Sequence, residues 1–352
     1  IKIMAYSSIV KPTDYFNTKL HTGNGSTQSI TGVGFQPDFT WIKDRSGGND
    51  HQIVDAVRGA TKAVSSNRND TATFSDGLTS FDSDGYSLGN NTRYNGSSTN
   101  YVGWNWKANG AGSSNTDGSV TSTVSVNTTA GFSISKYTGT GSNLTFGHGL
   151  GAIPDWIMIK NLDVSQAWRV YHQKMTASDP YSKRMVLSET GAETSNALGL
   201  SQDPTASLIY LDNSTGCTND NGEDFICYAW TQKKGYSKFG SYIGNGNSDG
   251  TFVYTGFKPA FVIIKRADSS DGWHLFDNKR DVDNVIERRI EAESESAENT
   301  SIDWCDFLSN GIKHRYTGGG TNASGGTYIY MAFAEAPFVA NNSGTAVPVT
   351  AK

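Results

Sequence analysis

The sequence predicts an all-β protein built from tandem antiparallel repeats, and three observations support this. The chain of 352 residues has 39 glycines. Its 16 phenylalanines and 16 tyrosines are interleaved with turn residues, which is typical of many short strands. One block also occurs three times: a glycine, a proline three residues later, and an apolar strand closed by a lysine, at residues 34–43, 151–160 and 256–265. Equal offsets in segments that otherwise differ indicate an internal repeat.

A second shared position follows each lysine at the same distance, and Asp55, His172 and Asp277 occupy it. Two further histidines, His51 and His274, lie in the strand just before this position. Because aspartate and histidine replace one another here, hydrogen bonding to a neighbouring strand explains the position better than catalysis does. We therefore assign no catalytic residue.

The repeats divide the chain into segments of different composition. The stretch after the first repeat consists mainly of Gly, Ser, Thr and Asn, and it has too little apolar surface to order itself. Residues 233–235 are the whole connection between the second and third repeats, so we expect these two repeats to pack together. The expected segments are an N-terminal arm at 1–15, β repeats at 16–108, 131–232 and 236–338, a flexible linker at 109–130, and a flexible C-terminal tail at 339–352.

Residues 281–292 fit two different structures. The apolar residues of 282–290 lie at helical spacing, and Asp281 is a suitable N-cap for a helix. The equivalent part of the second repeat, 184–188, alternates like a strand. We expect a strand at 288–292, with at most a short helical turn before it.

Composition and charge exclude several classes of function. The net charge of −5 offers no basic surface for phosphates, so we expect no nucleic-acid partner. No apolar run approaches the roughly eighteen residues that a bilayer span requires, so we expect no membrane insertion. The cysteines are odd in number and lack metal-ligand spacing, so we expect no disulfide framework, no metal site and no cofactor. We expect all three thiols, those of Cys217, Cys227 and Cys305, to be buried.

The first residues carry no signal for export. Met4 resembles a natural start, and neither it nor Ile1 is followed by the apolar segment of a secretory signal. Yet a β protein rich in Gly, Ser, Thr, Asn and aromatic residues has the composition of many extracellular proteins. A virion protein, which is assembled in the host cytoplasm and released by lysis, would satisfy both observations.

Several motifs imitate functional sites. Residues 246–250 match the G-x-S-x-G pattern of a hydrolase, but that pattern needs a helix after it, and a strand at 251–254 follows instead. We expect a hairpin turn there, as at the equivalent Gly23-Asn24-Gly25. The Asp/Asn-rich segments 82–85 and 219–224 lack EF-hand spacing, so we expect turns that bond their own backbone, and calcium binding there stays open.

The carboxylates offer no catalytic pair that stands out. One acidic run has the pattern of a solvated face, and it consists of Glu291, Glu293, Glu295 and Glu298.

The tryptophans include the best candidates for ligand contact. Trp168 and Trp273 begin the same strand in two repeats, and an exposed indole ring can stack on a sugar. In the first repeat His51 takes this position. Packing in the core or between domains is the favoured interpretation, because tryptophan is usually mostly buried. Glycan stacking by Trp168 and Trp273 is the alternative.

Three blocks of this sequence resemble a known family. They are the Gly-Phe-x-Pro block with its strand and lysine, the turn at 307–311, and the segment 322–335, which contains Tyr-Ile-Tyr-Met-Ala-Phe-Ala. They resemble repeats in tail-fibre and other virion proteins of tailed bacteriophages, especially marine ones, over about residues 5–338. The resemblance implies lectin-like or laminin-G-like β-sandwich repeats, which the number of expected strands allows. It brings no catalytic or ligand-binding residues with it.

We therefore expect tandem antiparallel β-sandwich repeats in a non-enzymatic virion protein. The leading hypothesis is an exposed tail fibre or host-recognition appendage that is assembled as a homo-oligomer. Its partners would be other virion proteins, copies of itself and a host surface glycan. A capsid decoration protein or another purely architectural fibre subunit is the alternative, and a tailspike enzyme that degrades polysaccharide is a remote one.

Overall fold

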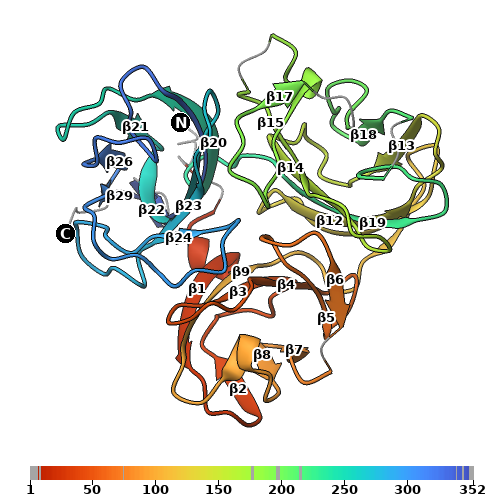
Figure 1. Cartoon of the computed structure of the whole chain (residues 1–352), viewed down its shortest axis with the longest axis horizontal. Helices are drawn as coiled ribbons and strands as arrows, with labels where there is room; N and C mark the ends of the chain where they lie inside the picture. Colours follow the sequence, from red (N-terminus) through yellow and green to blue (C-terminus); the bar gives the residue numbers. More distant parts are fainter. Residues whose placement is uncertain are drawn as a thin grey trace.

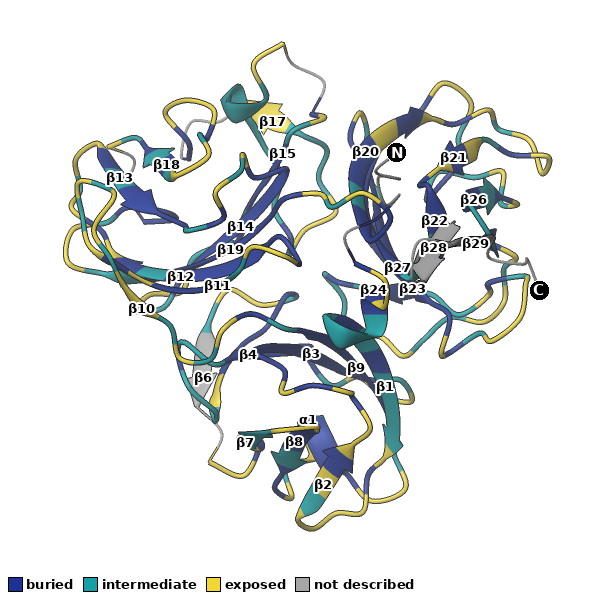
Figure 2. Ribbon diagram, turned by 180° about the vertical axis from the view of Figure 1, so that it is seen from behind, coloured by how far each residue is buried: buried dark blue, intermediate teal, exposed yellow. Residues whose placement is uncertain are grey.

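Three β modules surround a common centre in the computed structural model (Figure 1). The structure describes residues 7, 9–73, 75–175, 178–195, 199–213, 216–337, 339–342 and 345–348. Strands β1–β9 form module 1, β10–β19 form module 2, and β20–β27 form module 3. Each module has an inner sheet that faces the centre and a smaller outer sheet, and every strand pair within these sheets is antiparallel (Figure 2). The predicted all-β sandwich fold is confirmed.

Module 1 has an inner sheet in the order β1-β9-β3-β4-β5-β6 and an outer sheet in the order β2-β8-β7. The inner strands are β1 (Phe16–Thr22), β9 (Asn100–Trp106), β3 (Phe39–Asp44), β4 (Gln52–Asp55), β5 (Lys62–Val64) and β6 (Thr71–Thr73). The outer strands are β2 (Gln28–Thr31), β8 (Gly85–Leu88) and β7 (Leu78–Asp82). Two short helical segments accompany them, η1 (Pro12–Asp14) and α1 (Thr92–Asn95).

Module 2 has an inner sheet in the order β10-β11-β12-β19-β14-β15. These strands are β10 (Ser113–Asn115), β11 (Ser122–Asn127), β12 (Phe132–Thr138), β19 (Asp224–Trp230), β14 (Trp156–Asn161) and β15 (Arg169–His172). The outer sheet pairs β13 (Leu144–Gly147) with β18 (Leu208–Leu211). A third pair lies beside β15 after the turn η2 (Pro180–Ser182), and it consists of β16 (Lys183–Arg184) and β17 (Thr194–Ser195).

Module 3 has an inner sheet in the order β20-β27-β22-β23-β24 and an outer sheet in the order β21-β26-β25. The inner strands are β20 (Ser237–Ile243), β27 (Thr327–Pro337), β22 (Phe257–Arg266), β23 (Trp273–Asp277) and β24 (Ile290–Glu291). The outer strands are β21 (Phe252–Tyr254), β26 (Gly311–His314) and β25 (Cys305–Leu308). A separate hairpin, β28 (Val339–Asn342) and β29 (Thr345–Pro348), follows β27.

The three repeated blocks form the same strand in each module, namely β3, β14 and β22. Each of these strands lies between the closing strand of its repeat and the strand that leads to the Asp/His position. The registers also correspond, as Phe39 pairs with Trp106, Trp156 with Trp230, and Phe261 with Phe333. The internal repeat inferred from equal offsets is therefore present in the structure.

The modules share one core, which is not what tandem sandwiches would give. Each module has a private core between its two sheets. A further cluster, here called the central core, joins the three inner sheets and contains Phe39 and Trp106 of module 1, Phe132 and Trp230 of module 2, and Phe261 and Phe333 of module 3. The expected packing of the second repeat against the third is present, and the first repeat packs against both, because each inner sheet is apolar on both faces and buries one of them against the other two modules.

The predicted linker at 109–130 is also wrong. Residues of this stretch form β10 and β11, which extend the inner sheet of module 2. Val124 and Ser125 are buried, and the backbone N–H of Asn109 donates to the Ser125 hydroxyl at 2.8 Å. The free edge of β12 supplies backbone hydrogen bonds, so this segment needs few apolar side chains to become ordered.

The termini and the ambiguous segment differ in part from expectation. The described part of the arm contains η1, and residues 1–6 and 8 lie outside the described residues. The tail expected to be flexible contains the hairpin β28–β29, whereas residues 343, 344 and 349–352 lie outside the described residues. In the ambiguous segment, β24 falls within the predicted strand, and its 281–287 part has bends and an isolated bridge rather than a helical turn.

Candidate functional site

Each repeated lysine ties its module to a neighbouring one. The Lys160 ammonium group donates to the carbonyl of Asn161, in its own module, at 2.9 Å and to that of Asn69, in module 1, at 2.7 Å. The other two lysines do the same, Lys43 with Glu295 of module 3 at 2.9 Å and Lys265 with Thr190 of module 2 at 3.1 Å. Burial lowers the pKa of all three lysines to about 8. These contacts run around the ring in one direction, from module 1 to 3, from 3 to 2 and from 2 to 1.

The tryptophans considered for glycan stacking also join neighbouring modules. Trp168 and Trp273 are both 0% exposed, so neither presents a face to a sugar. The Trp168 indole donates to the Ser65 carbonyl of module 1 at 2.8 Å, and the Trp273 indole donates to the Val186 carbonyl of module 2 at 3.0 Å. Glycan stacking by these residues is therefore wrong, and packing between modules is confirmed. The equivalent His51 contacts the Glu291 carbonyl of module 3 at 3.0 Å.

The Asp/His position joins modules in the opposite direction. In module 1, Asp55 is buried with Arg58 and accepts a hydrogen bond from the Tyr228 hydroxyl of module 2 at 2.7 Å. In module 3, Asp277 pairs with Arg280 at 2.6 Å and accepts the indole N–H of Trp104, in module 1, at 3.0 Å. The predicted hydrogen-bonding role is confirmed, although the partner strand belongs to the next module.

Module 2 has His172 in place of the aspartate because the side chain opposite this position differs. By register, Met331 takes the place that Trp104 and Tyr228 take in the other modules, and a thioether offers no donor for a carboxylate. His172 instead contacts the backbone carbonyl of Tyr330 at 3.3 Å, and burial lowers its pKa to about 3, which keeps it neutral. Met175 stands where the other two modules have arginine, so the ion pair is replaced as a unit.

The glycine turns proposed as hairpins connect different sheets instead. The turn after β20 leads to β21 in the outer sheet, and the turns after β1 and β12 do the same. The hairpin prediction is therefore wrong, although the positive φ angles at Gly25, Gly141 and Gly246 confirm turns. A buried asparagine, missed in the sequence, accepts a backbone N–H from each turn: Asn95 from Asn24, Asn219 from Thr140, and Asn322 from Asn245.

The acidic run is not simply a solvated face. Glu298 forms a bidentate pair with Arg45 of module 1, with nitrogen–oxygen distances of 2.8 and 3.0 Å. Glu293 accepts the backbone N–H of Trp273 at 2.9 Å, and burial raises its pKa to about 7. In the Asp/Asn-rich segment 82–85, the Asp82 carboxylate accepts hydrogen bonds from the hydroxyl groups of Ser80 and Ser87.

The three cysteines are buried and free, as predicted.

An open groove lies between modules 2 and 3, with a volume of about 430 Å³. Among the described strands, β11 covers the edge of β12 in module 2, whereas the equivalent β20 of module 3 has β27 alone beside it, as β1 of module 1 has β9. The reason lies in the connections, because the chain entering module 2 is long enough to add strands, whereas residues 233–235 are too short to do so. The groove therefore lies between two edge strands, β20 and β21, and the end of module 2.

Exposed aromatic rings line this groove. Phe252 and Tyr254 point away from the private core of module 3, into which Val253 packs, and they are 42% and 49% exposed. The Lys238 ammonium group lies 5.1 Å from the centre of the Tyr254 ring and donates to the Tyr254 carbonyl at 2.8 Å, which fixes β21 against β20. The polar lining consists of Gln173, Lys174 and Gln232 from module 2 and Ser241 from module 3.

The comparisons with known proteins place the chain in a family. A family model described as a domain of unknown function, DUF7483, matches residues 11–337. The chain belongs to the DUF7483 family. Because the match runs from η1 through β27, the DUF7483 domain comprises all three modules, the central core and the groove. No curated protein and no solved structure matches this chain.

Among the described residues, no group of three or more His, Cys, Asp or Glu side chains is placed to hold a metal ion. The described helices are also too short to cross a membrane.

Proposed function

We propose that this DUF7483 protein is a non-enzymatic structural protein of a tailed-phage virion, in an exposed tail fibre or host-recognition appendage. The groove between modules 2 and 3 would bind a saccharide of the host surface. The resemblance of the repeated blocks to phage virion proteins supports the setting. The groove supports the recognition role.

The exposed ring pair, Phe252 and Tyr254, is the observation that carries the recognition role. Aromatic faces pack against the apolar C–H faces of sugars, and amides and hydroxyls satisfy sugar hydroxyls. Gln173, Gln232 and Ser241 supply these groups around the rings. The volume of about 430 Å³ lies within the usual range for small-molecule sites, so a short saccharide fits. Several copies in one appendage would turn weak sites into firm attachment.

A glycan array tests the recognition role directly. We expect the purified protein to bind a subset of bacterial surface glycans and the variants Phe252→Ala and Tyr254→Ala to lose that binding. Val282→Ala is the matched control, because Val282 is 76% exposed and does not line the groove. Binding that persists in both groove variants would show that the groove is not the site. Electron microscopy of labelled particles tests the virion setting separately.

A purely architectural role is the second candidate. The repeated lysine, tryptophan and aspartate side chains contact other modules rather than solvent. Such use of polar groups is typical of a rigid building block. If the protein binds no glycan on the arrays and no host cell, but is incorporated normally into particles, this role is favoured over recognition.

A further inference from the structure

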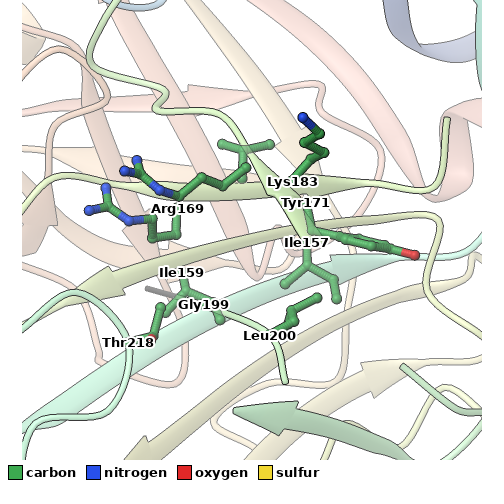
Figure 3. A pocket seen from close by; sticks show the side chains of 10 residues that line it. Ile157, Ile159, Arg169, Tyr171, Lys183, Gly199, Leu200 and Thr218 are labelled. Atoms are coloured by element: carbon green, nitrogen blue, oxygen red, sulfur yellow. The ribbon is translucent and has the colours of Figure 1, made fainter. Parts of the chain in front are cut away.

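A small cavity lies between the sheets of module 2, apart from the groove (Figure 3). Its walls are the apolar side chains of Ile157 and Ile159 on β14, and of Val170, Tyr171 and Leu200. Its volume is about 20 Å³. That space accommodates about one water-sized group.

Two arginines from adjacent strands line this cavity. Arg169 lies on β15 and Arg184 on β16, and Val170 and Met185 bridge the two strands through backbone hydrogen bonds of 2.9 and 3.0 Å. The Arg169 guanidinium donates to the Trp168 carbonyl at 3.1 Å and to the Cys217 sulfur at 2.8 Å. Among the described residues, neither arginine has a carboxylate within ion-pair distance.

The arginines also retain unused donors. The Nε atoms of Arg169 and Arg184 are both buried, and neither has a hydrogen-bond partner within the described part of the chain. A buried donor without an acceptor is costly, and two like charges close together add to that cost. Burial lowers the pKa of Arg169 and the charge of Arg184 lowers it further, against the raising effects of Cys217 and of the more distant Glu189.

The equivalent positions in the other modules have internal partners. In module 1, Gln52 accepts a hydrogen bond from the Tyr94 hydroxyl at 3.1 Å and donates to the Asp50 carbonyl at 3.1 Å. In module 3, His274 lies 3.0 Å from a carboxylate oxygen of Asp271. Module 2 alone places a positive charge at this position without an anion to match it among the described residues.

We propose that module 2 binds an oxyanion, the carboxylate or sulfate group of an acidic ligand, between Arg169 and Arg184. A guanidinium group binds such an anion through paired N–H donors, and the unpaired Nε atoms would then gain acceptors. The cavity has room for one oxygen atom of such a group, and the rest of the ligand would lie outside it. Lys183 also lines the cavity and adds a third positive charge.

Calorimetric titration of the full chain with sodium sulfate and with sodium glucuronate, at constant ionic strength, tests this site. We expect Arg184→Gln to weaken binding of the anion about tenfold or more, because it removes one charged donor group. The variant should fold normally, since Arg184 has no ion pair to lose among the described residues, and its melting temperature without added anion checks this. Arg315→Gln is the matched control, because Arg315 lies in module 3 and already pairs with Asp306.

The two titrants separate the sources of the anion. Binding of glucuronate but not sulfate supports an acidic sugar as the ligand, and the reverse supports an inorganic oxyanion. No binding of either titrant, or equal binding by wild type and Arg184→Gln, overturns the proposal. Because Phe252 and Tyr254 lie in a different pocket, the glycan-array result for those residues is independent of this one.

Discussion

Trp104 of module 1 donates its indole N–H to the buried carboxylate of Asp277, in module 3, at 3.0 Å. We expect Trp104→Phe to lower the free energy of unfolding by about 1–3 kcal/mol more than a substitution that removes ring volume alone, because it leaves a buried acceptor short of one donor. Urea denaturation measures this. Trp304→Phe is the control. Trp304 is also buried, and like Trp104 it has an arginine over its ring. Its indole N–H, however, has no partner among the described residues. Equal losses in the two variants would contradict the prediction.

His314 should make the protein less stable in acid. Its ring stacks on Tyr242 at 4.7 Å, neither ring nitrogen has a partner in the described structure, and burial lowers its pKa to about 3. Between about pH 3 and 6.5 the unfolded chain binds a proton here that the folded chain does not, so stability falls as the pH falls.

The variant His314→Phe tests this effect. We expect it to reduce the slope of unfolding free energy against pH by up to one proton in that window, or about 1.4 kcal/mol per pH unit. Tyr242→Phe should leave the slope unchanged, because tyrosine does not titrate there. A slope that is the same in His314→Phe and wild type would refute the expectation.

The repeated lysines should likewise make stability rise with pH, but in alkali. Burial lowers the pKa of Lys160 to about 8 from its usual value of 10.5. Between these values the unfolded chain keeps a proton that the folded chain has released, so this group adds stability as the pH rises; below about pH 8 both states hold the proton and the slope vanishes. Lys160→Met should lower the slope of unfolding free energy against pH between pH 8 and 10 by the equivalent of about one bound proton. Urea denaturation measures this slope. Lys174→Met, which replaces an exposed lysine, is the control.

The buried asparagine under each turn should contribute more to the free energy of unfolding than an exposed asparagine near it. Asn219 accepts the backbone N–H of Thr140 at 2.8 Å and donates to the carbonyls of Ser142 and Asp212, both at 2.7 Å. We expect Asn219→Ala to lower the free energy of unfolding by about 2–4 kcal/mol, because three part-buried hydrogen bonds made by a buried side chain are lost. Asn221→Ala, two residues later on the surface, should cost less than about 0.5 kcal/mol. A small loss at Asn219 would show that water replaces the side chain.

The sequence allowed the repeated strands to be predicted but not their arrangement. The block that becomes β3 has Phe39, Thr40, Trp41 and Ile42 in succession, so both faces of the strand had to be buried. This pattern says nothing about what covers each face. The private core covers Ile42 and the central core covers Phe39 and Trp41, and only the folded ring distinguishes them.

The groove could not be predicted for a related reason. Phe252, Val253 and Tyr254 alternate as any strand does, and which face meets water depends on whether another segment covers it. In module 2 the stretch expected to be a linker provides that cover, since its low hydrophobicity concealed its strands. The donors left over at Arg169 and Arg184 depend on side-chain contacts across strands, which a single sequence does not reveal.

The short connection at residues 233–235 has a consequence beyond the groove itself. A ring of three identical chains would present the same edge three times, so all three positions would be open or all three filled. Joining the repeats in one polypeptide removes that constraint. One edge can be closed by the incoming chain while the equivalent edge of another module stays open, and one aspartate can become a histidine.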